Sequence, residues 1–186
     1  PPNLRINLIF RAYDDGIAFR YHMPKPSDQP EFTLLSEKTH FNFPSNHTCF
    51  AHPRDDYQGN YENSFDSTSI SKISSDTLIG LPLLVKSSNC WISVLEADLT
   101  DYSGMSVKRD SKGNNRLVST LAPSMENERV KVTGKTPHYS PWRVVMVGEQ
   151  AGEFIESELI YNLNDPTDLD DVSWIKPGKV VWPWWN

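Results

Sequence analysis

The chain has 186 residues, which suits one domain, or one domain with part of a second. Hydrophobic residues make up 38% of it and the mean hydropathy is −0.52, enough for a core and too apolar for a disordered chain. A net charge of −6 argues against nucleic acid as a partner, and no apolar run approaches the ~18 residues of a membrane span.

Strand signals dominate the chain in sequence order. Alternating apolar residues over 4–10, a turn at 14–16 and a second apolar run over 17–21 predict a β-hairpin. The polar stretch 51–76 is expected to form a long loop, and 152–162 is the one candidate helix. The pattern predicts an all-β protein built as a sandwich. Further strands are expected over 32–35, 40–43, 77–85, 90–95, 116–121, 130–132 and 142–147.

The C-terminal end is rich in tryptophan and follows an acidic stretch, 165–171, that is expected to be a solvated linker. One interpretation is a terminal strand that packs on its own domain. The other, which we favour, is that a second domain begins here and that the sequence is a piece of a longer protein. Exposed aromatic side chains in such a piece predict self-association. The tryptophans concerned are Trp174, Trp182, Trp184 and Trp185.

Cysteine and histidine give no metal or redox signature. Cys49 and Cys90 are not in a Cys-x-x-Cys pair, so we expect two lone buried thiols, although the spacing leaves a disulfide open. Four of the five histidines are scattered without metal-ligand spacing and are expected to be surface or capping residues. They are His40, His47, His52 and His138.

Two charged residues are candidates for a site. Glu96 follows the apolar strand 90–95, at the point where the chain leaves the sheet, and could bind a metal or a sugar hydroxyl or simply be an exposed strand-end residue. Arg143 precedes another apolar strand and is expected to pair with a buried carboxylate rather than with a ligand. No Ser-His-Asp set, Cys-His pair or acid/base carboxylate pair can be assembled, so no catalytic residue is predicted in this chain.

Several runs of the sequence resemble the N-terminal domain of glycoside hydrolase family 97. They are Arg-Ala-Tyr-Asp-Asp-Gly-Ile-Ala-Phe-Arg-Tyr at 11–21, Glu-Ala-Asp-Leu-Thr-Asp-Tyr at 96–102 and Thr-Pro-His-Tyr-Ser-Pro-Trp-Arg at 136–143, followed by runs at 156–164 and 174–179. The resemblance implies a β-super-sandwich related to galactose mutarotase, followed by a (β/α)8 catalytic barrel. It also implies an exo-acting α-glucosidase or α-galactosidase that is periplasmic or secreted.

On this resemblance, residues 1–164 correspond to the sandwich domain, 165–178 to a linker and 179–186 to the first barrel strand. The family's sandwich has further strands before the position of Pro1, so the domain is expected to be partial. Pro183 departs from the family pattern, because proline cannot donate to a strand ladder.

The resemblance also implies a calcium ion, held by glutamates of the barrel together with one from this domain, Glu96. The acid and the base or nucleophile belong to the barrel, so α-glucosides or α-galactosides would be hydrolysed there and this chain alone would be inactive. Two alternatives stay open at this point. One is a freestanding carbohydrate-binding β-sandwich, and the other is a mutarotase-like enzyme, which would need an acid/base pair within the sandwich.

Overall fold

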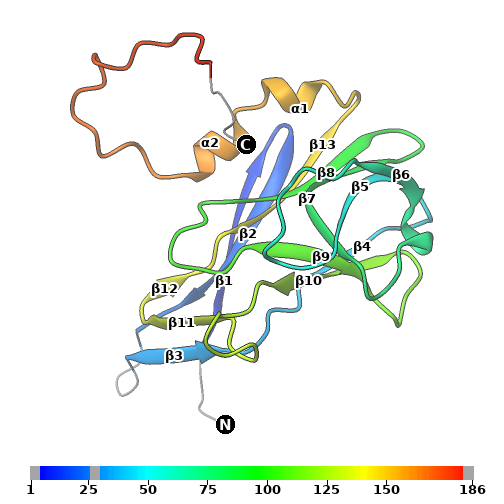
Figure 1. Cartoon of the computed structure of the whole chain (residues 1–186), viewed down its shortest axis with the longest axis horizontal. Coiled ribbons are helices and arrows are strands. Elements are labelled where there is room, and N and C mark those ends of the chain that lie inside the picture. Colours follow the sequence, from blue (N-terminus) through cyan, green and yellow to red (C-terminus); the bar gives the residue numbers. More distant parts are fainter. Residues whose placement is uncertain (1–4, 26–29, 182–186) are drawn as a thin grey trace.

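The computed structural model describes residues 5–25 and 30–181, and these form a curled antiparallel β-structure with two short helices (Figure 1). The strands are β1 (Asn7–Tyr13), β2 (Gly16–Met23), β3 (Glu31–Leu34), β4 (His40–Asn42), β5 (Thr48–Arg54), β6 (Asp66–Ser69), β7 (Leu78–Lys86), β8 (Trp91–Ala97), β9 (Met105–Arg109), β10 (Arg116–Leu121), β11 (Val132–Lys135), β12 (His138–Tyr139) and β13 (Trp142–Gly148). The two α-helices are α1 (Glu153–Glu156) and α2 (Leu159–Leu163), and η1 (Ile70–Lys72) is a single 3-10 turn.

Most strands join one eleven-stranded sheet in the order β1-β2-β13-β8-β7-β9-β10-β4. The strand β5 pairs with both β6 and β7, β12 pairs with β2, and β3 with β11 forms a separate two-stranded ribbon. The main core lies inside the curl and draws apolar side chains from β5, β7, β8, β9, β10 and β11. The all-β class predicted from the sequence is therefore confirmed.

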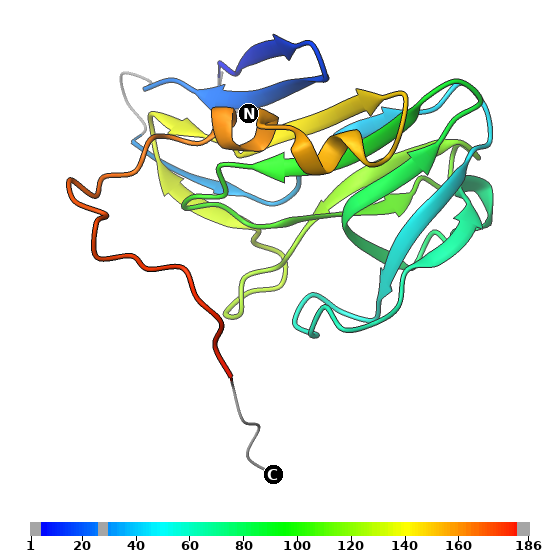
Figure 2. The same cartoon turned by 90° about the horizontal axis from the view of Figure 1, so that it is seen from above.

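The strand β13 shows how the sheet separates two environments. Alternate side chains of a strand point to opposite faces, and Trp142 packs with α2 in a second, smaller core outside the curl. The guanidinium groups of Arg20 and Arg11 lie over the Trp142 ring, 4.4 and 4.8 Å from its centroid. The next residue, Arg143, takes the opposite face. Figure 2 shows both helices lying along the outer face of the sheet.

Several elements differ from the sequence predictions. The N-terminal hairpin is confirmed, with Tyr13 paired to Gly16 across the turn. The long loop predicted over 51–76 is wrong, because this stretch contains the end of β5, all of β6 and η1. The single helix predicted over 152–162 is two short helices, which break at Ser157, whose backbone is extended. The strands β9 and β12 were not predicted.

The segment from 164 to 181 leads away from the sheet and contains no helix or strand (Figures 1 and 2). All of its side chains are exposed, including Trp174 at 68%. The first three residues of the predicted barrel strand, 179–181, are not in a strand here. The other tryptophans of this end, Trp182, Trp184 and Trp185, lie outside the described residues, so their association stays a prediction. No described helix has the length and apolar character needed to cross a membrane.

Candidate functional site

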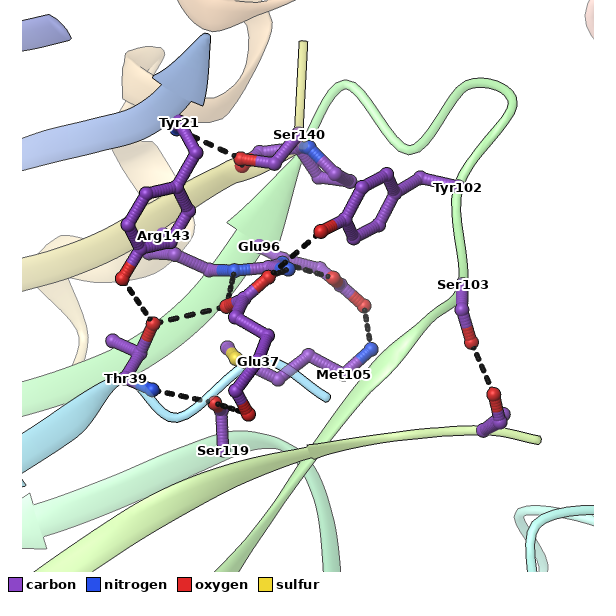
Figure 3. Close-up of polar contacts among 12 residues, drawn as sticks. Tyr21, Glu37, Thr39, Glu96, Tyr102, Ser103, Met105, Ser119, Ser140 and Arg143 are labelled. Carbon is purple, nitrogen blue, oxygen red and sulfur yellow. Dashed lines mark hydrogen bonds and ion pairs between the residues drawn. The ribbon is translucent and has the colours of Figure 1, made fainter. Parts of the chain in front are cut away.

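The centre of the candidate site is Arg143, a guanidinium that is fully buried inside the curl (Figure 3). Its Nε and Nη2 donate to Oε1 and Oε2 of Glu37, at 2.8 and 2.7 Å, in the parallel two-bond arrangement that matches a guanidinium to a carboxylate. Its Nη1 donates to Oε2 of Glu96 at 2.8 Å. One cation therefore joins two carboxylates. The sequence predicted that Arg143 pairs with a buried carboxylate, but it did not identify the partners.

Glu37 lies in the connection between β3 and β4, and its side chain is only 6% exposed. Thr39 Oγ1 donates to its Oε1 at 2.9 Å, and the Tyr102 hydroxyl donates to its Oε2 at 3.2 Å. Its main chain is held too, because Ser119 Oγ donates to the Glu37 carbonyl at 3.0 Å. Because Thr39 uses its hydroxyl proton on Glu37, the 2.9 Å contact with the Tyr21 hydroxyl has tyrosine as the donor.

Glu96 is the penultimate residue of β8, where it was predicted to be, and stands opposite Arg143 in the β8–β13 ladder. Its side chain is 15% exposed, so it is the most exposed of the three charged groups. The Met105 N–H donates to its Oε1 at 2.9 Å. Gly104 also lies beside this carboxylate, because a Cβ built on it would be 3.7 Å from Oε1. Burial raises the pKa of the Glu96 carboxyl, while the Met105 N–H and Arg143 oppose the rise.

The loop that follows Glu96 returns Tyr102 over the cluster. Asp98 and Asp101 have positive φ angles, 56° and 49°, which residues other than glycine seldom adopt. Asp98 is held in place by an ion pair with Arg20 at 3.1 Å. The Tyr102 ring lies 5.8 Å from the Arg143 guanidinium carbon. Burial, and then the charge of Glu37, raises the pKa of Tyr102, so its hydroxyl stays protonated and donates.

With both carboxylates ionised, the cluster carries one net negative charge, because two carboxylates face one guanidinium. A charge without a counterion is costly in a buried position. Within residues 5–25 and 30–181 there is no group of three or more His, Cys, Asp and Glu side chains that could hold a metal ion. The donor set therefore fits a cation only as a single anionic ligand, Glu96, with the other ligands supplied from outside the described residues.

Comparison with known proteins identifies the family. The family model of the glycosyl-hydrolase 97 N-terminal domain matches residues 2–166. The chain belongs to this family. A retaining α-galactosidase of Bacteroides thetaiotaomicron is 32% identical over 97% of this chain, and a probable retaining α-galactosidase of Streptomyces bingchenggensis is 28% identical over 97%. The chain spans 30% and 26% of these two relatives.

Solved structures agree with this assignment. A glycoside hydrolase family 97 enzyme from Pseudoalteromonas sp. strain K8, in complex with acarbose, superposes with a TM-score of 0.80 and 31% sequence identity. A variant of that enzyme in complex with panose superposes with a TM-score of 0.81. Each match covers 93% of this chain and 25% of the other. The resemblance inferred from the sequence runs is confirmed, and so is the β-sandwich of the family 97 N-terminal domain.

The histidines of this family 97 domain are only partly where the sequence predicted them. His40 is exposed and lies 3.2 Å from Asp110. The surface assignment is wrong for His47 and His52, which are 8% and 2% exposed. The His52 ring stacks on Tyr61 with a centroid separation of 5.4 Å. Aromatic packing of this kind leaves no trace in the spacing of the sequence.

Both cysteines are free thiols, as expected. Cys49 is fully buried in the main core, and this burial raises its pKa to about 11. Cys90 is only half-buried, so the expectation that both thiols are buried is wrong for this one.

The residue that sequence reasoning missed altogether is Glu37. It lies between two short strands, without apolar periodicity or a motif around it. Its importance comes from contacts with Arg143, 106 residues further along the chain. Tyr102 ends the run 96–102 that resembles the family, but nothing in that run predicts its hydrogen bond to Glu37.

Proposed function

We propose that this chain is the N-terminal domain of a calcium-dependent, exo-acting α-glycosidase, which braces a catalytic barrel and supplies Glu96 as one ligand of the calcium ion. The observation that carries the proposal is the cluster around Arg143, which leaves one unbalanced negative charge on the side of Glu96. In this proposal, residues 1–164 are the sandwich domain, 165–178 the linker and 179–186 the start of the barrel. Export to the periplasm or the medium belongs to the same proposal.

The substrate class follows from the relatives. The two curated relatives are named retaining and probable retaining α-galactosidases, and the Pseudoalteromonas enzyme was solved with acarbose and with panose. We therefore assign this chain to an enzyme that acts on α-galactosides or α-glucosides. A bound Ca²⁺ supplies Lewis-acid and orienting chemistry at the sugar.

Calcium takes six to eight oxygen ligands, so one carboxylate from this domain is a contribution to the site and not a site by itself. Glu96 has the necessary chemistry, since each of its oxygens accepts one hydrogen bond in the structure and keeps a further lone pair. What this chain does is hold that carboxylate in one orientation and limit its contact with water.

Hydrolysis itself needs two positioned carboxyls, an acid and a base or nucleophile. Glu37 and Glu96 do not suit these roles, because both are bonded to Arg143, and Glu37 also accepts bonds from Thr39 and Tyr102. This arrangement also counts against a mutarotase-like activity at this site. We therefore place the acid and the base or nucleophile in the barrel.

The test uses the polypeptide encoded by the complete gene. Glu96→Gln keeps the shape of the side chain and removes its charge, so it should weaken calcium binding and lower activity on nitrophenyl α-glycosides, with part of the loss restored by excess calcium. Glu31→Gln is the matched control, because Glu31 is an exposed carboxylate whose only ion pair among described residues, with Lys135, spans 3.9 Å.

An unchanged calcium dependence in Glu96→Gln would contradict the ligand role. A stop codon directly after Asn186, together with sugar binding by the 186-residue chain, would instead support the freestanding carbohydrate-binding module.

A further inference from the structure

The hydrogen bonds of Arg143 are divided unequally between its two partners. Glu37 occupies Nε and Nη2, and Glu96 receives only Nη1. Because a guanidinium is rigid and planar, fixing two of its nitrogens fixes the direction in which the third one points. The orientation of the bond to Glu96 is therefore set by Glu37.

Glu37 can fix this direction because it is itself immobilised by several parts of the chain. Thr39 just before β4, Tyr102 from the β8–β9 loop and Ser119 from β10 all bond to it. Its side chain is also largely buried, at 6% exposed. The cluster in Figure 3 is thus a rigid frame, and Glu96 is its partly exposed end.

The division of bonds also sets the charge that Glu96 presents. A guanidinium bound to one carboxylate through two bonds would leave that pair neutral, and a neutral pair attracts a cation weakly. In this cluster the two-bond contact is with Glu37, so Glu96 keeps its negative charge while it is still held by Arg143 and by the Met105 N–H.

We propose that Glu37 and Arg143 are positioning residues for Glu96: Glu37 holds Arg143 through two bonds, and Arg143 holds the Glu96 carboxylate, still charged, in the orientation of a calcium ligand. This inference rests on the proposed role of Glu96. Partners that orient a metal ligand in this way contribute roughly 10–100-fold to metal affinity.

The experiment measures calcium affinity in the full-length enzyme, by titration calorimetry and by displacement of luminescent Tb³⁺, with folding monitored by circular dichroism. In Glu37→Gln, Arg143 loses its two-bond partner and is free to form two bonds with Glu96 instead. The calcium affinity should therefore fall by about 10–100-fold although Glu96 itself is intact. Glu31→Gln should keep wild-type affinity. In a Glu96→Gln background, Glu37→Gln should cause no further loss, because Glu37 acts only through Glu96.

The outcomes separate the two proposals. If Glu96→Gln binds calcium as tightly as wild type, the ligand role of Glu96 fails. If Glu96→Gln weakens binding and Glu37→Gln does not, or if the two losses simply add, the positioning role fails while the ligand role stands. Should Glu37→Gln not fold, the milder variants Thr39→Val and Tyr102→Phe each remove one bond to Glu37, and wild-type calcium affinity in both overturns the positioning role.

Discussion

Arg143→Met is the substitution that should damage this domain most directly. Methionine fills much of the volume of arginine but leaves Glu37 and Glu96 without their shared cation. The Arg143 side chain is 0% exposed and that of Glu37 6%, so water can make up for little of what Glu37 loses. Removing one partner of a buried ion pair costs about 3–5 kcal/mol. Glu96, at 15% exposed, regains some hydration and adds less.

The assay is urea unfolding followed by tryptophan fluorescence. With a slope of about 2 kcal/mol per molar urea, a loss of about 4 kcal/mol lowers the unfolding midpoint by about 2 M. Lys135→Met is the control, because Lys135 is 79% exposed and lies 3.9 Å from Glu31, and it should leave the midpoint where it is in wild type.

A second variant identifies the cause of the loss. In Arg143→Met combined with Glu37→Gln, an uncharged amide replaces the buried Glu37 carboxylate and can still accept a hydrogen bond from Thr39. The double variant should recover about 2 kcal/mol of the loss, because the cost lies in the unpaired charge and not in the missing contacts. A midpoint for Arg143→Met within about 0.5 M of wild type, or no recovery in the double variant, would refute this reasoning.

Three other expectations can be checked on the 186-residue chain. At pH 8 Ellman's reagent should modify Cys90 in the folded protein and Cys49 only in urea. Because burial raises the pKa of Cys49 from 9.0 to about 11, the free energy of unfolding should also decrease as the pH rises from about 9 through about 11. Gly16→Ala should lower the urea midpoint, since its Cβ would lie 2.6 Å from the Val145 carbonyl, whereas Gly152→Ala, with no atom within 4 Å, should change it little. The purified chain should not hydrolyse nitrophenyl α-glucosides or α-galactosides, and measurable turnover would show that two working carboxyls are present after all.

The sequence predicted elements well where local pattern and turn chemistry agree. The β1–β2 hairpin has alternating apolar residues and an Asp-Gly turn, and it forms as expected. No strand was predicted at β5, which ends in His52, Pro53 and Arg54, residues that are not typical of a strand. Those residues are held in the sheet by pairing with β7, with a shift of register between Phe50 and His52. Tertiary pairing decides such a strand, and local preference does not.

The candidate site could be predicted only in part for a related reason. The sequence pattern singles out Glu96 because it ends an apolar strand, and Arg143 because its charge comes directly before another apolar strand. That the two meet depends on the β8–β13 register, which joins residues 47 apart in the chain. Glu37 is brought in by a connection without regular structure, and no periodicity identifies a residue of that kind.

The two faces of β13 have such different surroundings that they strongly specify the register of this strand in the sheet. Trp142 packs with α2 and with the guanidinium groups of Arg20 and Arg11, while Arg143 binds two carboxylates. A slip by one residue would turn the indole toward the carboxylates and bury the guanidinium against apolar side chains. Both errors are costly, so misaligned pairings of this strand are strongly disfavoured during folding, and the residues that hold Glu96 also help to select the one sheet in which it is held.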